Sequence, residues 1–459
     1  MLRWKSACEN PRIVATALVA LGGVTIFLVN FPGSMEFDSF VQLAEARARS
    51  YADWHPAVMS WLLGVYDALP GPVAGWFIGI DMLMAFGALA ALLWLPQRVS
   101  WAAVGVAGAA LLLPQLVLSQ AVVWKDTLFA DAALLATVLI GFGVTLWRRR
   151  RLRLALIGGA AVLLALAVLT RQNGIVIVPI LAAGLGYVAA RLSGRWRAGA
   201  AYGAGLFAAV AVLAVAGQSA LLLRWDGTPS RDQQLNVLKL YDITGMVRRD
   251  PSLPLAVFDR EAPGLAKLVR SEGVKLWSPL RNDTMEIPPI VDAIETVPPP
   301  VYTRQWRALI AARPGLYLAV RAELFRWVFQ APEVKLCHPI HVGDQPGEEK
   351  LEELVIVPRM DAHDIALKHY GEFFLYHTPV FSHALYALLG VAVLVLLLRR
   401  RTPADLVLAA LVGSSLAFAA TFAVISIACD YRYLYLVDLS ALAGALYVAA
   451  DWRGLFKRP

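Results

Sequence analysis

The chain has 459 residues, 58% of them hydrophobic and 17% charged, and its mean hydropathy is +0.59. These values exclude an ordinary soluble domain and indicate a polytopic membrane protein. The net charge of +8 comes mostly from basic loops between apolar segments. It therefore predicts membrane orientation, and we expect no nucleic-acid partner.

Apolar segments long enough to cross a bilayer follow one another along the chain. We predict ten membrane spans, at residues 13–31, 72–95, 100–122, 127–147, 154–171, 174–191, 198–222, 378–398, 404–427 and 432–450. No small-residue cleavage site follows the first segment, so we expect an uncleaved signal anchor. Together the spans predict an all-α polytopic fold.

Lysine and arginine residues gather in alternate connections between the spans. The basic connections are the two termini, Arg98, 148–153, 191–197 and 399–401. Because basic loops stay on the cytoplasmic side, both termini are predicted to be cytoplasmic and the chain to lie in the cell inner (plasma) membrane. The remaining connections then face outward.

The first long outer connection is the loop 32–71. Around residues 36–45, apolar and acidic residues alternate at near-helical spacing. The stretch Pro56–Leu69 is apolar but too short to cross a bilayer. Both patterns predict interfacial helices.

The second long outer connection, residues 223–377, is polar and rich in proline. It is large enough for its own core, so we predict a mixed extracytoplasmic domain between spans seven and eight. Residues 317–329 predict an amphipathic helix, whereas Pro288-Pro289 and Pro298–Pro300 indicate irregular chain. The chain thus divides into two transmembrane modules (1–222 and 378–459) and this domain.

Five polar motifs stand where apolar segments meet the outer face. They contain Asp38, Trp54-His55-Pro56, Lys125-Asp126, Arg171-Gln172-Asn173-Gly174 and Asp430-Tyr431-Arg432-Tyr433. Polar groups at such borders are costly to hold, so their convergence on one face predicts an active site.

Asp38 is either a general base toward a hydroxyl group or a helix cap, with Glu36 and Asp53 as its nearest competitors. His55 either caps the helix that starts after Pro56 or contacts a phosphate and assists proton transfer.

Basic residues at the remaining motifs suit a lipid phosphate. Lys125 can bind one, while Asp126 holds that lysine or caps the next helix. A pair of side chains that snorkel to the membrane interface is equally consistent. Arg171 and Asn173 lie in a tight turn whose Gly174 permits left-handed geometry or close approach. Arg432 can bind phosphate beside Tyr433, although an aromatic belt with an ion pair is equally consistent.

Three carboxylates, Asp81, Asp131 and Asp438, lie within predicted spans. They are functional candidates by position, although Asp131 and Asp438 can instead neutralise Lys125 and Arg432.

The three cysteines form no framework, and their spacing gives no reason to expect a Cys337–Cys429 bond. No nucleotide loop or metal-ligand spacing is present. His338, His341 and Asp344 come nearest to a metal site. We therefore expect no cofactor, with a divalent cation on Asp38 and Glu36 left open, and an activated substrate that arrives through the lipid phase.

This layout resembles the GT-C superfamily of membrane glycosyltransferases. The likeness rests on Glu36-Phe37-Asp38-Ser39 in a long first outer loop, on His55-Pro56 and Lys125-Asp126, on Arg171-Gln172-Asn173-Gly174, and on Arg432-Tyr433 near a late span. Such enzymes move a sugar from a polyprenyl-phosphate carrier to an acceptor at the outer face.

The resemblance implies a role for each motif. Asp38 would be the general base, and His55 would orient the acceptor or the phosphate. Lys125, Arg171 and Arg432 would bind the donor phosphate, with Glu36, Asp126, Asn173 and Tyr433 in support.

The sequence thus predicts a glycosyltransferase that uses a polyprenyl-phosphate-linked sugar and an envelope glycan, lipid or protein as acceptor, within membrane lipids. A polysaccharide ligase or polymerase that uses a lipid-diphosphate oligosaccharide is the alternative enzyme. A transporter or flippase is the alternative outside the enzymes, but a transporter should show polar residues near the midplane and internal repeats.

Overall fold

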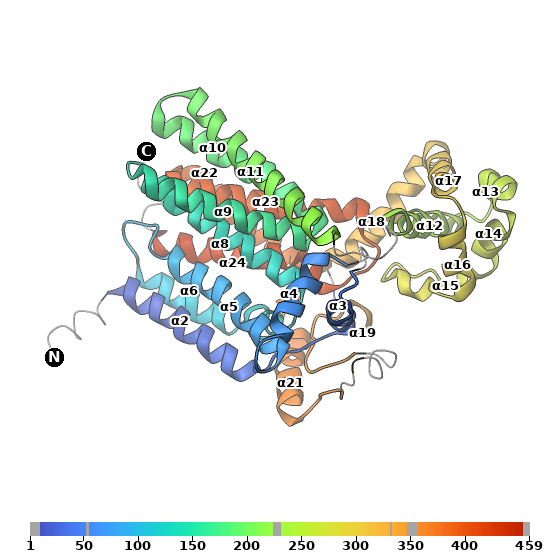
Figure 1. Ribbon diagram of the computed structural model, residues 1–459, viewed down its shortest axis with the longest axis horizontal. Coiled ribbons are helices and arrows are strands. Elements are labelled where there is room, and N and C mark those ends of the chain that lie inside the picture. The colour runs from blue at the N-terminus through green and yellow to red at the C-terminus, as the bar shows by residue number, and fades with distance from the viewer. Residues whose placement is uncertain are drawn as a thin grey trace.

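The computed structural model describes residues 10–51, 55–223, 231–330, 333–346, 354 and 357–452, and Figure 1 shows their arrangement. Asp53, Trp54 and the basic residues nearest both termini lie outside these ranges. Within them the regular structure is helical, with a few isolated β-bridges. The predicted all-α fold is confirmed. The outer segment was predicted to be a mixed domain, but the elements in its described residues are helices.

Nine helices of the described residues are long and apolar enough to cross a membrane. They are α2 (Pro11–Asn30), α5 (Val73–Leu92), α8 (Lys125–Thr145), α9 (Arg150–Thr170), η2 (Gln172–Val176) continued by α10 (Ile177–Ser193), α11 (Trp196–Leu222), α22 (His383–Arg400), α23 (Pro403–Ile425), and η5 (Tyr431–Leu434) continued by α24 (Tyr435–Ala450). The chain is therefore a multi-pass membrane protein, as its composition predicts.

The span predicted at 100–122 is broken. Helix α6 (Trp101–Leu111) is followed by α7 (Pro114–Val117) and η1 (Ser119–Ala121), and the two parts meet at an angle of 67°. Pro114 has no backbone N–H and its ring clashes with the preceding turn, so a straight helix cannot continue through it.

Helices α8 and α24 form the centre of the bundle. In each, 83% of the apolar window is buried, compared with 17% in α11 at the periphery. Figure 1 shows α8 and α24 side by side within the bundle. Polar residues at the outer ends of these two helices are therefore enclosed by protein.

The first outer loop contains the two predicted helices, α3 (Phe37–Ala48) and α4 (Ala57–Asp67). Just before α3, the backbone of Ser34 exchanges hydrogen bonds with Ala121 and Val123. The Ser39 hydroxyl also donates to the Val123 carbonyl at 2.6 Å. These bonds fix the start of α3 against the chain that leads into α8.

The outer segment contains a helical lobe. Its helices are α12 (Arg231–Arg249), α13 (Ala256–Glu261), α14 (Pro263–Leu268), α15 (Val274–Leu276), α16 (Pro288–Thr296), α17 (Pro299–Ala312) and α18 (Pro314–Gln330). A separate hydrophobic core joins them, with Tyr241, Phe258 and Tyr302 fully buried.

Within this lobe, α18 covers the predicted helix at 317–329. The prolines at 288–289 and 298–300 were expected to mark irregular chain, and this is wrong because they open α16 and α17. Proline suits the first helical turn, where its missing N–H has no partner to lose.

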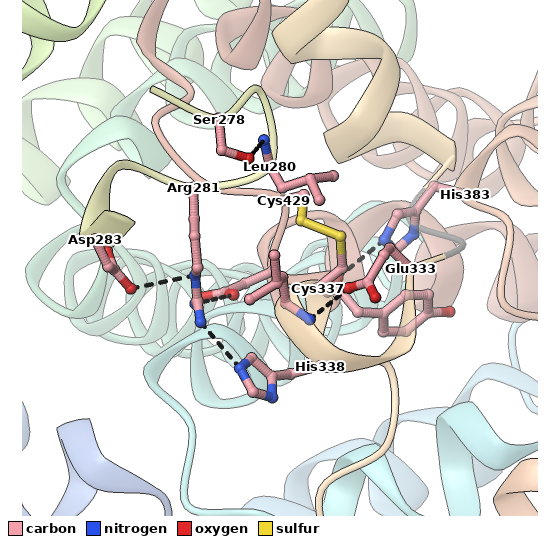
Figure 2. Close-up of a disulfide and its surroundings, with 12 residues drawn as sticks. Ser278, Leu280, Arg281, Asp283, Glu333, Cys337, His338, His383 and Cys429 are labelled. Atoms are coloured by element: carbon pink, nitrogen blue, oxygen red, sulfur yellow. Dashed lines mark hydrogen bonds and ion pairs between the residues drawn. A yellow bond between two sulfur atoms is a disulfide. The ribbon is translucent and has the colours of Figure 1, made fainter. Parts of the chain in front are cut away.

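A disulfide joins Cys337, at the end of α19 (Val334–Cys337), to Cys429, 92 residues further along the chain (Figure 2). The spacing of the cysteines predicts no such bond, and this prediction is wrong. The two cysteines are brought together by tertiary folding, which spacing along the chain does not encode. The bond ties the outer segment to the chain that enters α24.

A buried polar network links α22, α24 and the short helix before α24. His383 Nδ1 lies 2.8 Å from Asp438 Oδ1, and its Nε2 lies 2.9 Å from the carbonyl oxygen of Tyr431. The Tyr431 hydroxyl donates to Asp438 Oδ2 at 2.6 Å. Asp131 instead accepts a hydrogen bond from Gln120 at 2.8 Å.

These contacts overturn the idea that Asp131 and Asp438 neutralise Lys125 and Arg432. Asp438 instead joins with His383 to fix Tyr431, the residue before Arg432.

Replacing Asp438 with alanine should destabilise the protein, because His383 and the Tyr431 hydroxyl would lose a buried acceptor. Removing one member of such a pair costs about 3–5 kcal/mol. Thermal unfolding in detergent would measure the loss. Lys368→Ala, on the exposed face of α21 (Ala362–His377), should change stability by less than about 0.5 kcal/mol. Equal melting temperatures for the two variants would contradict the assignment.

Candidate active site

A cavity of about 680 Å³ lies at the outer end of the bundle. Its walls come from the first outer loop, the starts of α8 and α24, and the outer segment. They include Glu36, Asp38, Glu45, His55, Lys125, Arg281, Asn282, Asp283, Glu286, His338, His341, Asp430, Arg432 and Tyr433. Four of the five predicted motifs therefore meet around one cavity.

Arg432 is the hub of this cavity, in the short helix η5 (Tyr431–Leu434) that precedes α24. Its guanidinium contacts Glu36 directly and lies 2.6 Å from Asp38 Oδ2. Asp430 lies at 3.4 Å and Asp126 at 3.7 Å. Arg432 is only 8% exposed, so these carboxylates balance a charge that water does not reach. The arrangement orients Asp38.

Arg171 stands behind Arg432. It forms an ion pair with Asp126 and lies 4.9 Å from the ring of Tyr433. Its Nε donates to Asn173 at 3.2 Å. Asp126 thus pairs with the two arginines and not with Lys125.

The turn η2 (Gln172–Val176) requires glycine at 174 for space. A Cβ at Gly174 would come within 2.5 Å of the Phe129 ring, so close approach is the reason for this glycine. Arg171 and Asn173 line a smaller cavity of about 200 Å³, which also touches Lys125 and Tyr433. The fifth motif therefore adjoins the main cavity.

Lys125 lines both cavities. Among the described residues it has no ion pair within 4.0 Å, whereas Arg432 and Arg171 are both paired. Among the basic residues that line this cavity, Lys125 is therefore the one for which the described residues supply no ion pair.

His55 lies where α4 begins, next to Lys125. It is 8% exposed, and its Nδ1 has no hydrogen-bond partner. Burial, together with the charge of Lys125, lowers the pKa of His55 to about 4. His55 is therefore a neutral imidazole at neutral pH, with one nitrogen free to bond a ligand.

An apolar cavity of about 510 Å³ adjoins this histidine. It lies among α4, α9, α10 and α11. Its walls include Ala57, Leu169, Ile175, Val178, Phe207, Val210, Ala214 and Leu221, with Gln172 and His55 among the polar members. His55 belongs to both this cavity and the main one. An apolar space among membrane helices thus reaches the polar site.

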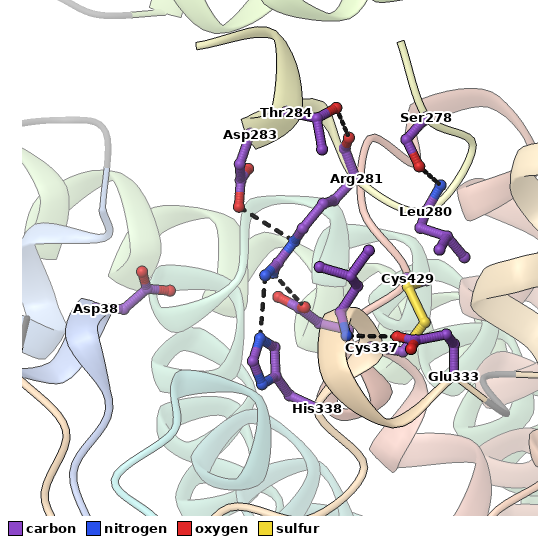
Figure 3. A network of polar contacts seen from close by, with 12 residues as sticks. Asp38, Ser278, Leu280, Arg281, Asp283, Thr284, Glu333, Cys337, His338 and Cys429 are labelled. Carbon is purple, nitrogen blue, oxygen red and sulfur yellow. Dashed lines mark hydrogen bonds and ion pairs between the residues drawn. A yellow bond between two sulfur atoms is a disulfide. The ribbon is translucent and has the colours of Figure 1, made fainter. Parts of the chain in front are cut away.

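The far wall holds residues that the sequence analysis missed. Figure 3 shows Arg281 across from Asp38, with Asp283 and His338 around its guanidinium. Arg281 lies 2.8 Å from Asp430, 3.1 Å from Asp283 and 3.0 Å from His338 Nε2.

Burial raises the pKa of Asp430 to about 7, against the opposing charge of Arg281. Burial and Arg281 also lower the pKa of His338. Local sequence gives no signal for Arg281. His338 and Asp430 were both named from the sequence, His338 as a metal candidate and Asp430 in the motif Asp430–Tyr433, so the residues of this wall that were missed are Arg281 and Asp283.

His338, His341 and Asp344, the residues predicted to come nearest to a metal site, are not a group with metal-ligand spacing among the described residues. His338 contacts Arg281, and Asp344 pairs with Arg359 at 3.1 Å. In the described part of the chain, the cluster with suitable ligand spacing is Asp361, His363 and Asp364 at the start of α21. Asp361 and Asp364 form a helix-capping box there. Glu36 and Asp38, for which a divalent cation was left open, both form ion pairs with Arg432.

Comparisons with known proteins give similarity of structure alone. No family model and no curated protein matches the chain. The structure is similar to the oligosaccharyltransferase of Archaeoglobus fulgidus in complex with Zn and sulfate, with TM-score 0.42 and 15% identity over 95% of this chain and 48% of that chain. The same archaeal enzyme in complex with an inhibitory peptide and a dolichol-phosphate gives TM-score 0.41 and 14% identity, over 95% and 50%.

The chain thus spans about half the length of the proteins that it resembles. Those proteins belong to the GT-C superfamily, the group whose motifs the sequence resembles.

Stability should depend on pH through His55. Its pKa is about 4 in the folded state and about 6.5 when exposed. The unfolded chain therefore binds a proton first as the pH falls, and the contribution of His55 to stability is lost between about pH 6.5 and 4. The melting-temperature difference between wild type and His55→Asn should shrink from pH 7.5 to 5. The exposed His377→Asn serves as control, and an unchanged difference for His55→Asn would refute the assignment.

Proposed function

We propose that this chain transfers a sugar from a polyprenyl-phosphate carrier to a hydroxyl group of an envelope glycan, lipid or protein at the extracytoplasmic face. The observation that carries the proposal is the junction at His55 and Lys125. There an apolar cavity among membrane helices meets a polar cavity that contains a carboxylate.

The donor fits this junction by its chemistry. A polyprenyl chain is apolar and belongs in the cavity among α4, α9, α10 and α11. Its phosphodiester carries one negative charge, which the ammonium group of Lys125 balances. The free nitrogen of His55 adds a hydrogen bond. Arg171 and Asn173 line the adjoining cavity and assist when negative charge grows on the leaving phosphate.

Asp38 acts as the general base. Arg432 contacts Oδ2 of Asp38, so Oδ1 faces the cavity and accepts the proton of the acceptor hydroxyl. The acceptor oxygen then forms a bond to the anomeric carbon, and the bond from that carbon to the phosphate oxygen breaks. Polyprenyl phosphate leaves, and the proton passes from Asp38 to solvent. Glu36, Asp126 and Tyr433 hold the two arginines in place.

Two observations support an extracytoplasmic site in the inner membrane. Basic residues occupy the connections at the opposite end of the bundle, as in Arg148–Arg151 and Arg399–Arg401. The Cys337–Cys429 disulfide adjoins the cavity through His338 and Asp430. Disulfides persist outside the reducing cytoplasm.

Asp38→Asn should lower transfer by about 10²–10⁴-fold, because the amide cannot accept the proton. The measurement is release of label from a radiolabelled polyprenyl-phosphate sugar into an envelope extract, with the purified chain in nanodiscs. Asp67→Asn is the matched control, since Asp67 pairs with Arg47 in the same outer loop and does not line the cavity. Near-normal transfer by Asp38→Asn would remove this residue as the base.

Lys125→Ala should weaken donor binding by about 10–100-fold, the effect of one charge-assisted hydrogen bond. Lys125→Arg should recover part of the affinity, and added salt should weaken wild type but hardly affect Lys125→Ala. The exposed Lys368→Ala should bind donor normally. Unchanged donor affinity in Lys125→Ala would place the phosphate elsewhere.

The same assay separates the alternatives. If several labelled monophosphate donors bind but no label is transferred, a lipid-diphosphate oligosaccharide is the next substrate to test, as a ligase or polymerase would require. Movement of label across the bilayer without transfer would identify a flippase.

A further inference from the structure

A fourth cavity, of about 220 Å³, opens in the outer lobe. We call it the lobe groove. It is lined by Gln233, Val237, Leu240, Asn282, Met285, Glu286, Ile290, Val291, Ile294 and Glu295. Asn282 and Glu286 also line the main cavity, so the two spaces adjoin at these residues.

The lobe groove has an apolar floor and an acidic edge. Leu240 and Ile290 are buried parts of the lobe core, and Val291 at the opening is 37% exposed. Glu286 and Glu295 are exposed at the edge. Such a surface suits a ligand with a short apolar group and a polar end.

The lobe groove joins the main cavity at a different place from the membrane cavity. The membrane cavity enters at His55, beside Lys125, whereas the lobe groove enters at Asn282 and Glu286. Figure 3 shows Asp38 across the main cavity from Arg281 and Asp283, which adjoin Asn282 in sequence. A molecule that passes from the lobe groove into the main cavity would therefore enter it at Asn282 and Glu286, and not at His55.

Charge at this entrance is negative. Asp283, Glu286 and Glu295 lie near one another in sequence, and the nearby cation Arg281 already contacts Asp430 and Asp283. An anionic ligand is disfavoured here and an amine is favoured.

We propose that the lobe groove is the acceptor subsite and that it takes a hydroxyl compound carrying an apolar group and a cationic amine. The assignment of the lobe groove as an acceptor subsite rests on the proposed transferase function. The preference for a cationic apolar ligand does not depend on it.

Two small probes test this preference directly. The n-hexylammonium and hexanoate ions have similar apolar chains and opposite charges, and each is small enough for the lobe groove. Binding to the full chain in phosphatidylcholine nanodiscs is followed by ligand-observed NMR, with empty nanodiscs as blank. We expect hexylammonium to bind about tenfold more tightly, since each exposed charge contact changes affinity by up to about 1 kcal/mol.

Two variants assign the signal to the lobe groove. The double variant Glu286→Gln with Glu295→Gln should remove the difference between the probes. Ile294→Trp should fill the groove and weaken both. Asp259→Asn with Glu323→Gln is the matched control on other surfaces of the lobe. Equal binding of the two probes to wild type would overturn the proposal, and so would a preference that survives the double variant.

Turnover then separates this proposal from the proposed function. Glu295→Gln alone, which lines the lobe groove and not the main cavity, should raise the acceptor KM several-fold while leaving donor affinity and slow donor hydrolysis unchanged. A wild-type chain that binds hexylammonium selectively but turns over no donor would refute the transferase and retain the cationic ligand. Normal donor turnover with no probe preference would refute the lobe groove alone.

Discussion

The ion-pair cluster around Arg432 is the interaction on which the candidate site depends. A buried guanidinium is stable only when carboxylates compensate for its lost hydration. Here they come from Glu36 and Asp38 in the first outer loop, from Asp126 in α8, and from Asp430, two residues before Arg432. Because these residues are far apart in the chain, satisfying one charge brings together the walls of the cavity.

Because of this cluster, the basic residues of the site differ in whether a carboxylate pairs with them. Arg432 and Arg171 are occupied by carboxylates and stabilise the architecture, whereas Lys125 has no such partner among the described residues. The carboxylates of Asp38 and Asp430 lie near enough to act on the Lys125 ammonium charge without forming an ion pair with it. His55 beside Lys125 stays neutral, so it adds no second positive charge there.

Much of this arrangement follows from sequence patterns with a direct physical cause. Apolar length predicts the spans, and polar residues at their outer borders predict the motifs that meet around the cavity. Arg281 and the disulfide could not be predicted, because their partners come from tertiary folding and not from local periodicity. Pro114 and Pro299 show a related limit, since proline breaks one helix and opens another according to the hydrogen bonds available around it.

The short segment that ends at Asp430 connects the two halves of the site. Cys429 bonds covalently to Cys337, and Asp430 forms an ion pair with Arg281. Residues 429–430 are therefore linked to the outer segment 223–377 by a disulfide and by an ion pair. Two residues after Asp430, Arg432 orients Asp38. The guanidinium of Arg281 on one side of the cavity and the carboxylate of Asp38 on the other are therefore both linked to the segment from Cys429 to Arg432.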